Sequence, residues 1–238
     1  MERNLIAIIP ARSGSKGLKN KNIKQLCGKP LIYWTIDFIL KSKLFARCIV
    51  TTDSPHYRDI AIQCGAEVPF LRTSELASDE ATSSDVILNV FDELDIPSST
   101  NDSFVLFEPT SPIRFQSDLE NVVRLISNTN RVVSISEAKS SHPLYQYKLS
   151  EGSRLTPFIL SSMASVRRQE MSNTFYLNGS FYASSIADFM RNPSFIVDQT
   201  IGALTEFWSS FEIDYEDDFL LCELIMTKLL SSSSSSSN

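Results

Sequence analysis

The amino-acid sequence predicts a three-layer α/β fold with a mostly parallel sheet. Short apolar segments rich in β-branched or aromatic residues alternate with segments of helical periodicity. The short segments are apolar throughout, as expected of strands that are buried on both faces. Because strand-like and helical segments alternate along the chain, successive strands are expected to be parallel, with helices covering the sheet.

The predicted strands share this short apolar character, and they cover residues 5–9, 48–52, 104–107, 132–135 and 175–183. The first predicted helix begins at Pro30, because proline suits the first helical position. Leu31, Trp34, Phe38 and Ile39 then recur at helical spacing. Further helical patterns cover residues 58–64, 84–94, 118–127 and 217–230.

The pattern indicates a single domain over residues 1–230 with an excursion at about 139–196. Residues 139–174 are polar and irregular, and such long interruptions in compact domains are usually functional. We expect the excursion to cover a site or to meet a partner subunit. Residues 231–238 are almost entirely serine and are expected to be disordered.

Composition excludes several classes of protein. The net charge of -6 argues against a general attraction to nucleic acid or to an anionic membrane. Four cysteines without a CxxC pair, and only two histidines, argue against a disulfide framework or a zinc site. The apolar run near the N-terminus is too short for a signal peptide, and no run approaches the ~20 residues of a membrane span. These observations predict a cytoplasmic protein.

The segment IIPARSGSKGLKNKNI (residues 8–23) contains many hydrogen-bond donors and few acceptors. It follows the first predicted strand, where α/β proteins commonly bind phosphates. Gly14 and Gly17 permit tight turns with amide groups directed at an anion, and Arg12 and Lys21 add full charges. The spacing matches neither GxxxxGK[ST] nor GxGxxG, so a solvated basic loop is the alternative.

Polar residues also follow the other predicted strands. Asp53 ends the second strand, and Glu108, Ser111 and Arg114 follow a later one. Near the C-terminus, FEIDYEDDF suggests another strand end. Two residues apart on a strand, Glu212 and Asp214 would point to the same face and could hold Mg²⁺. The alternative for this acidic segment is capping of the last helix.

These segments together resemble the CMP-sialic acid synthetase family, whose members are cytidylyltransferases that activate nonulosonic acids. The resemblance is carried in order by IIPARSGSKGLKNKNI, GKPLIYWTI, TTDS, GAEVPFLRTSELASD, EPTSPIR, NGSFY and EID. It implies a Rossmann-like nucleotidyltransferase fold, CTP and a nonulosonic acid as substrates, Mg²⁺ or Mn²⁺, and release of pyrophosphate. It also implies a homodimer in which the excursion, around Arg168 and Phe195, completes the neighbouring site.

The resemblance also assigns roles to individual residues. Nucleotide-binding residues would be Arg12, Ser15, Lys21, Asn22, Arg72 and Ser83, with the last two near the cytosine and its sugar. Acceptor-binding residues would be Glu108, Ser111, Arg168 and Tyr182, and a bidentate grip on the sugar carboxylate would suit Arg168. Asp214 and Glu212 would hold the metal, and catalysis would depend on Arg12, Lys21 and Asp214. Without the resemblance, Ser83 could equally cap a helix, and Tyr182 could be a core residue.

Two positions depart from the family pattern. Glu108 stands where many members have glutamine, and Tyr145 stands where many have lysine. Both changes remove favourable contacts for an anionic acceptor, which favours a modified nonulosonic acid such as legionaminic acid over N-acetylneuraminate. The alternatives are a CMP-Kdo synthetase, another sugar nucleotidyltransferase, a catalytically inactive nucleotide-binding regulator and a structural scaffold.

Overall fold

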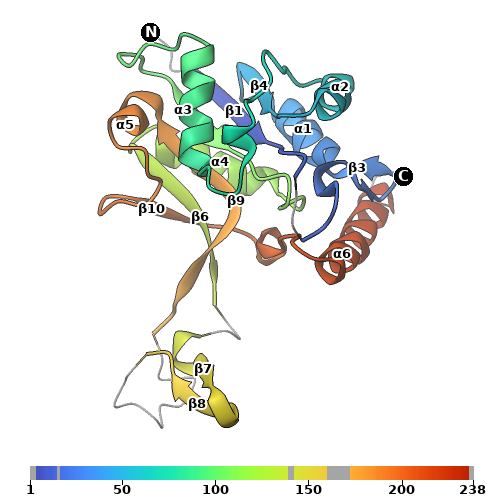
Figure 1. Ribbon diagram of the computed structural model, residues 1–238, viewed down its shortest axis with the longest axis vertical. Helices are drawn as coiled ribbons and strands as arrows, with labels where there is room; N and C mark the ends of the chain where they lie inside the picture. The colour runs from blue at the N-terminus through green and yellow to red at the C-terminus, as the bar shows by residue number, and fades with distance from the viewer. Residues whose placement is uncertain (1–3, 15–16, 139–141, 160–171, 236–238) are drawn as a thin grey trace.

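A six-stranded sheet forms the centre of the protein, with the strand order β10-β6-β9-β5-β1-β4 (Figure 1). The computed structural model describes residues 4–14, 17–138, 142–159 and 172–235 of the chain. The strands of this sheet are β1 (Leu5–Pro10), β4 (Arg47–Thr51), β5 (Ser103–Leu106), β6 (Arg131–Glu137), β9 (Phe175–Ser185) and β10 (Ile201–Leu204).

The sheet is mostly parallel, as predicted. β1 is parallel to β4 and to β5, and β10 is parallel to β6. β9 is antiparallel to both β5 and β6, so it runs against the other strands of this sheet. All five predicted strands are present, and β10 is a further edge strand that the apolar pattern did not indicate.

The helices are α1 (Leu31–Ser42), α2 (Pro55–Gln63), α3 (Ser83–Glu93), α4 (Gln116–Ile126), α5 (Ile186–Arg191) and α6 (Glu216–Ser235). The five predicted helices are confirmed. Pro30 precedes the first of them as its N-cap, so α1 begins one residue later than expected.

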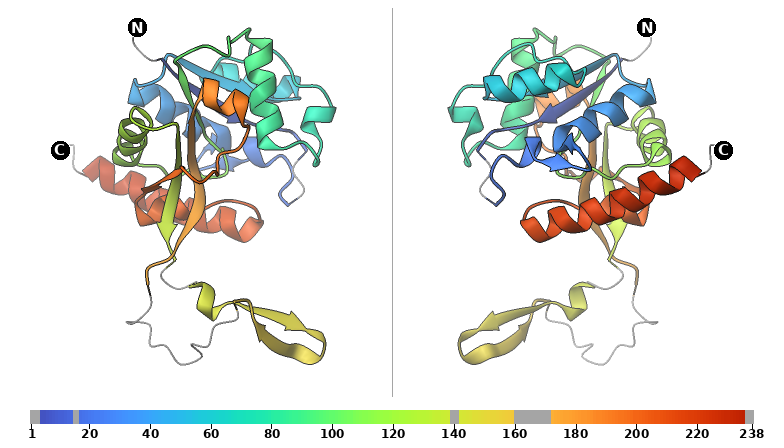
Figure 2. Two further views of the ribbon diagram at one scale, coloured as in Figure 1. Left: turned by 90° about the vertical axis from the view of Figure 1, so that its left-hand side faces the viewer. Right: turned by 90° about the vertical axis from the view of Figure 1, so that its right-hand side faces the viewer.

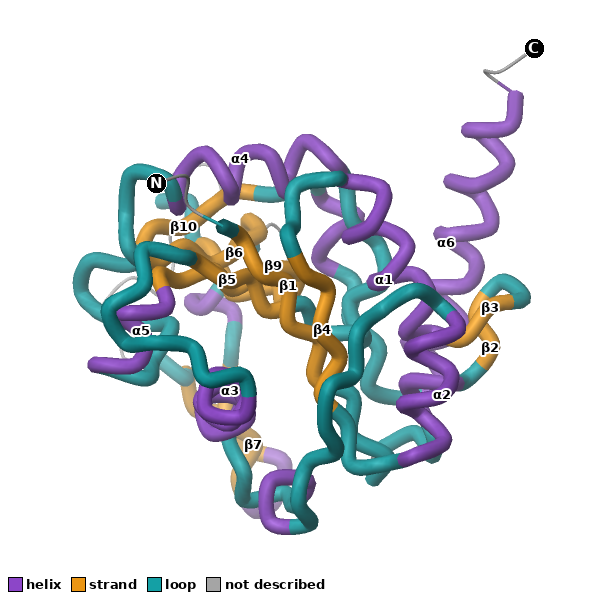
Figure 3. The backbone as a smooth tube through the Cα atoms, turned by 90° about the horizontal axis from the view of Figure 1, so that it is seen from above, coloured by secondary structure: helices purple, strands orange, loops and turns teal. Residues whose placement is uncertain are grey.

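Two helical layers cover the sheet because side chains alternate along each strand. Ala7 and Ile9 of β1 pack in one core with residues of α1, α2 and α4. Ile6 and Ile8 point the other way and pack with residues of α3 and α5. Figure 3 shows the two groups of helices on opposite sides of the strands. A third apolar cluster joins α6 to Leu26, Leu31 and Ile113.

The predicted excursion is an arm that stands away from the body of the protein (Figures 1 and 2). Beyond the edge of β5, β6 continues alone with β9 as far as the pair Glu137 and Phe175. Farther out lies a hairpin of β7 (Tyr147–Ser150) and β8 (Arg154–Pro157). No helix in the described part of the chain has both the length and the apolar character needed to cross a membrane.

The prediction of a final strand at residues 212–214 is wrong. These residues form a loop between η6 (Phe207–Ser210) and α6. Ile213 is fully buried, and its N–H donates to the carbonyl of Thr110 at 2.8 Å. The buried Ile213 between the exposed Glu212 and Asp214 gives the alternation that is typical of a strand. The segment nevertheless forms no strand, because it lacks the ladder of hydrogen bonds to a neighbouring strand.

Disorder from residue 231 onward stays a prediction, although α6 as described continues to Ser235. The hydroxyls of Ser231 and Ser232 both donate to the carbonyl of Lys228 at 2.9 Å. A formed helix extends at little cost, and serine side chains can satisfy helical carbonyls in this way.

Phe195 is partly buried. Its ring packs within the same chain, at 4.9 Å from the ring centroid of Phe189 and 5.2 Å from that of Tyr182. The role of Phe195 at a neighbouring site stays a prediction, and within its own chain the residue is held by this aromatic cluster.

Candidate active site

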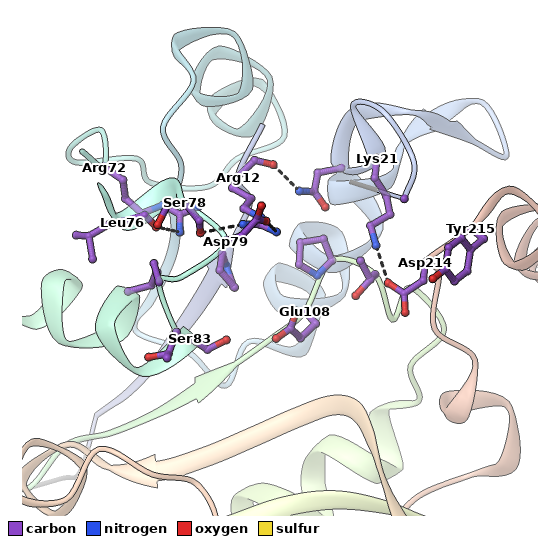
Figure 4. A pocket seen from close by; sticks show the side chains of 18 residues that line it. Arg12, Lys21, Arg72, Leu76, Ser78, Asp79, Ser83, Glu108, Asp214 and Tyr215 are labelled. Atoms are coloured by element: carbon purple, nitrogen blue, oxygen red, sulfur yellow. Dashed lines mark hydrogen bonds and ion pairs between the residues drawn. The ribbon is translucent and has the colours of Figure 1, made fainter. Parts of the chain in front are cut away.

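A pocket of about 550 Å³ lies at the carboxyl ends of β1 and β5 (Figure 4). Open α/β sheets usually bind ligands at this edge. The pocket brings together seven of the predicted site residues: Arg12, Lys21, Asn22, Arg72, Ser83, Glu108 and Asp214. Segments that are distant in the sequence thus meet here, as the resemblance implied.

The loop that follows β1 and contains Gly14 and Gly17, here called the glycine-rich loop, is fixed to Asp53 at the end of β4. Asp53 accepts two hydrogen bonds from Ser13, one from the backbone N–H at 2.8 Å and one from the hydroxyl at 2.6 Å. Burial alone would raise the pKa of Asp53, but the bonds from Ser13 hold it below its usual range. Asn22 donates to the carbonyl of Arg12 at 3.1 Å and so fixes the other end of the loop.

Lys21 joins the glycine-rich loop to the acidic segment. Its Nζ donates to the carbonyl of Ile213 at 2.7 Å and to Oδ1 of Asp214 at 2.9 Å. The Asp214 side chain is 61% exposed and faces the pocket, whereas that of Lys21 is only 11% exposed. Gly17 passes so close that a Cβ would lie 2.5 Å from the Asp214 carbonyl oxygen. A larger residue at position 17 would therefore displace this junction.

Two arginines, Arg12 and Arg72, line the side of the pocket that faces Lys21 and Asp214. Arg12 forms an ion pair with Asp79 at 2.8 Å and donates to the carbonyl of Ser78 at 2.9 Å. Arg72 is 7% exposed, and its Nε and Nη2 have no hydrogen-bond partner among the residues that the structure describes. Buried donors without partners cost free energy, so this guanidinium is well suited to a polar ligand.

Ser83 lines the pocket at the start of α3 but does not cap the helix. Thr82 is the N-cap. Its hydroxyl accepts from the N–H of Asp85, and the Asp85 carboxylate accepts from the N–H of Thr82. The capping alternative for Ser83 is therefore excluded, and its hydroxyl remains available to a ligand.

Glu108 lies between the two walls of the pocket (Figure 4). Burial raises its pKa to about 7, the nearby Glu212 adds to the rise, and Arg114 and Lys21 oppose it. The Arg114 guanidinium lies beneath Glu108 and donates to its main-chain carbonyl at 2.6 Å, to Thr35 and to the carbonyl of Ser180. Burial in turn lowers the pKa of Arg114.

Ser111 and Glu212 lie beside this region but do not line the pocket. Glu212 is exposed, and its Oε1 accepts from the Thr110 hydroxyl at 3.1 Å. Ser111 is fully buried, and its Oγ would lie 3.2 Å from a Cβ at Gly179, which has a φ of +73°. Gly179 belongs to a bulge of β9, held by Asn178 through hydrogen bonds to Ser136 and Thr205.

Tyr182 has features of both of its predicted roles. It packs on Phe195, yet burial and the charges of Glu108 and Glu212 raise its pKa to about 12, which places its hydroxyl near these carboxylates. Ser15 and Arg168 lie outside the described residues. The sequence reasoning missed Leu76, Ser78, Asp79, Thr82 and Tyr215 as pocket residues. Only the segment SELASD, part of the resemblance, could have indicated some of them.

Asp214 is the residue of the pocket that is best suited to hold a metal ion. Mg²⁺ is commonly held by one or two carboxylates together with water and substrate phosphates, and the exposed Asp214 fits that requirement. Glu212 fits less well, because Thr110 already binds its carboxylate. Within the described ranges there is no cluster of three or more His, Cys, Asp or Glu side chains arranged for a metal.

Comparison with solved structures identifies the class of fold. The structure of CMP:2-keto-3-deoxy-manno-octonic acid synthetase complexed with CTP matches with a TM-score of 0.68 and 16% identity, covering 94% of this chain and 99% of that one. A 4-diphosphocytidyl-2C-methyl-D-erythritol synthase matches with a TM-score of 0.68 and 11% identity, covering 95% and 99%. The chain therefore has the α/β fold of these nucleotidyltransferases.

Sequence relatives identify the family. A profile of the family described as Cytidylyltransferase matches residues 6–155. N-acylneuraminate cytidylyltransferase of Streptococcus agalactiae is 34% identical over 90% of this chain and 51% of the relative. CMP-N,N'-diacetyllegionaminic acid synthase of Legionella pneumophila is 36% identical over 93% of this chain and 96% of the relative. The chain belongs to the cytidylyltransferase family, and it spans about half the length of the N-acylneuraminate cytidylyltransferases that it matches.

The raised pKa of Glu108 predicts a specific dependence of stability on pH. A carboxyl whose pKa is higher in the folded state stabilises the fold below its ordinary pKa of 4.5, and this stabilisation is lost as the pH rises through about 7. The glutamine of Glu108→Gln cannot ionise, so this variant should not lose stability in the same way. Between pH 5 and pH 8 its unfolding free energy should therefore rise by about 1–2 kcal/mol relative to that of the parent. This is less than the whole pKa difference would give, because Glu108 is partly exposed to solvent.

Urea unfolding at the two pH values measures this difference. Glu120→Gln, an exposed position on α4, is the matched control and should show no such change. If the difference in unfolding free energy between Glu108→Gln and the parent is the same at both pH values, ionisation of Glu108 does not destabilise the fold and the prediction is wrong.

Proposed function

We propose that the chain is a cytidylyltransferase that couples CTP to a nonulosonic acid and releases pyrophosphate. The observation that supports this most directly is the convergence of Arg12, Lys21 and Asp214 in one pocket at the carboxyl edge of the sheet. Membership of the cytidylyltransferase family favours CTP. The relative from Legionella pneumophila, which this chain matches over nearly its whole length, favours a legionaminic-type acceptor.

The reaction we propose is an in-line displacement at the α-phosphate. The anomeric hydroxyl oxygen of the acceptor bonds to the α-phosphorus while the bond from that phosphorus to the β-phosphate breaks. Pyrophosphate leaves, and the hydroxyl proton passes to solvent. Positioning and charge neutralisation supply most of the catalysis in such transfers.

The nucleotide would lie along the wall formed by Arg12 and Arg72. Arg72 and Ser83 would contact the cytosine and its sugar, because both line the pocket and have unused donors or a free hydroxyl. Arg12, Ser15, Lys21 and the amides near Gly17 would hold the phosphates. Lys21 would turn from Asp214 toward the leaving pyrophosphate once a phosphate offers a better acceptor.

Asp214 would hold Mg²⁺ or Mn²⁺, with Glu212 as a secondary ligand. A bound divalent ion offsets phosphate charge and can lower the pKa of the attacking hydroxyl. On the acceptor side we assign Glu108, Ser111, Arg168 and Tyr182. Tyr182 and Glu108 are neighbours, which is consistent with a shared role. Because the reaction uses CTP, we place it in the cytoplasm.

The choice of nucleotide tests the proposal. With a panel of nonulosonic acids, CTP should support pyrophosphate release far better than UTP, ATP or GTP. Release measured by a coupled phosphate assay is the readout. Equal rates with UTP would exclude a cytidylyltransferase, and tight CTP binding without turnover on any sugar would favour the nucleotide-binding regulator.

Replacement of Asp214 tests its role as metal ligand. Asp214→Asn keeps the shape and should change stability by less than ~1 kcal/mol, yet it should lower kcat by about 10²-fold or more because a transition-state charge contact is lost. Asp217→Asn, the same change on the exposed first turn of α6, is the control and should leave turnover near that of the parent.

An Asp214→Asn enzyme within about threefold of the parent, with the same Mg²⁺ requirement, would place the metal elsewhere and make Glu212 the residue to test. Lys21→Ala should also lose activity without unfolding, because we assign this side chain to the phosphates.

We further propose a homodimer formed through the arm. Its hairpin exposes Tyr147, Leu149, Leu155 and Phe158, each more than half exposed, and solvent is an unfavourable environment for so many apolar side chains together. Light scattering at micromolar concentration should give twice the chain mass, and Leu149→Glu with Leu155→Glu should shift the protein toward monomer. A parent protein that is a fully active monomer would refute the dimer.

A further inference from the structure

The carboxylate of Glu108 lines the pocket without a hydrogen-bond donor of its own. Among the described residues no side chain or main-chain N–H donates to its carboxylate oxygens. Arg114 directs its Nη2 at the Glu108 main-chain carbonyl, and its other donors reach Ser180 and Thr35. The guanidinium therefore holds the loop but leaves the carboxylate free to bind a ligand.

The surroundings of Glu108 favour a cation over a phosphate. Glu212 lies near enough to raise the pKa of Glu108, and both acids act on Tyr182. Of the two cations that act on Glu108, Arg114 donates to Ser180, Thr35 and the Glu108 main chain, and Lys21 is held by Asp214 and the Ile213 carbonyl. This side of the pocket would thus repel phosphate oxygens and would accept donor groups.

Glu108 is also placed for the acceptor rather than the nucleotide. It follows β5 and lies between the wall of Arg72 and Ser83 and the wall of Lys21 and Asp214 (Figure 4). In an in-line displacement the attacking sugar enters opposite the leaving pyrophosphate, which Arg12 and the glycine-rich loop would hold. The remaining approach to the α-phosphate would be the side of the pocket that Glu108 lines.

We propose that Glu108 selects the acceptor, and that the preferred acceptor presents a positively charged nitrogen group, an amine or an amidine, to this carboxylate. The inference rests on the proposed function. An ionised carboxylate only accepts hydrogen bonds, and a charged donor binds it more strongly than a neutral one. Partial burial strengthens the preference, because neither Arg114 nor Lys21 donates a hydrogen bond to this carboxylate.

The test uses acceptors that differ in charge and little in shape. N-acetylneuraminate is compared with its analogue in which an acetamidino group replaces the acetamido group, and with analogues in which one side-chain hydroxyl is replaced by an amine. Pyrophosphate release with CTP is measured for each sugar in the parent, in Glu108→Gln and in the control Glu120→Gln.

We expect the parent to use at least one cationic analogue with kcat/KM about tenfold or more above its neutral counterpart, which corresponds to ~1.4 kcal/mol. Glu108→Gln should reduce this ratio below about threefold while leaving the KM for CTP nearly unchanged. Glu120→Gln, exposed on α4 and outside the pocket, should keep the ratio of the parent.

The outcomes separate the inference from the function on which it rests. No pyrophosphate release with any nonulosonic acid would overturn the proposed function. Release with no preference for cationic sugars in the parent would overturn the inference alone, and this comparison requires no variant. A Glu108→Gln enzyme that keeps its acceptor ranking, loses CTP affinity or needs more Mg²⁺ would also overturn the inference, because Glu108 would then serve the nucleotide or the metal.

Discussion

The geometry of the candidate site depends on one junction between distant parts of the chain. The N–H of Ile213 donates to the carbonyl of Thr110, and the buried Ile213 side chain fixes the junction in the cluster beneath α6. This tie brings the exposed carboxylate of Asp214 to Lys21, which is 193 positions earlier in the sequence. Without it the acidic segment would be an unattached connection between β10 and α6, and the pocket would lack one wall.

The acidic side of the site is held by contacts from two parts of the chain, α4 and the bulge of β9. The buried Asp118 accepts from Glu206 and Ser209 and so fixes the turn that leads to residue 212. From the other direction, the bulge of β9 brings Gly179 against Glu212 and Ser111. A buried hydrogen-bond network restricts its members to one geometry, because an unpaired polar group is costly there. Carboxylates that repel one another can therefore be kept close together.

The basic side of the site is less constrained and suits a ligand that arrives with its own charges. Arg72 has buried donors without described partners, and Arg12 is paired with Asp79. A polyanionic nucleotide could take over such contacts, whereas the Glu108 side would repel it. The division of the pocket into a cationic and an anionic side gives each substrate one favourable orientation, which is what an in-line transfer requires.

The sequence by itself determined the local elements and the residue types of the site. Apolar runs and helical periodicity located five strands and five helices, because burial on both faces of a parallel sheet leaves a direct pattern in the chain. Lys21, Arg72 and Asp214 were found through their segments and meet as expected. The tertiary structure alone decided that Glu212 turns to Thr110, that Thr82 and not Ser83 caps α3, and that Phe195 packs against Phe189. Some of these outcomes follow from contacts between residues that are far apart in sequence, and others from two neighbouring residues that compete for one position. A local sequence pattern does not determine which of these contacts forms.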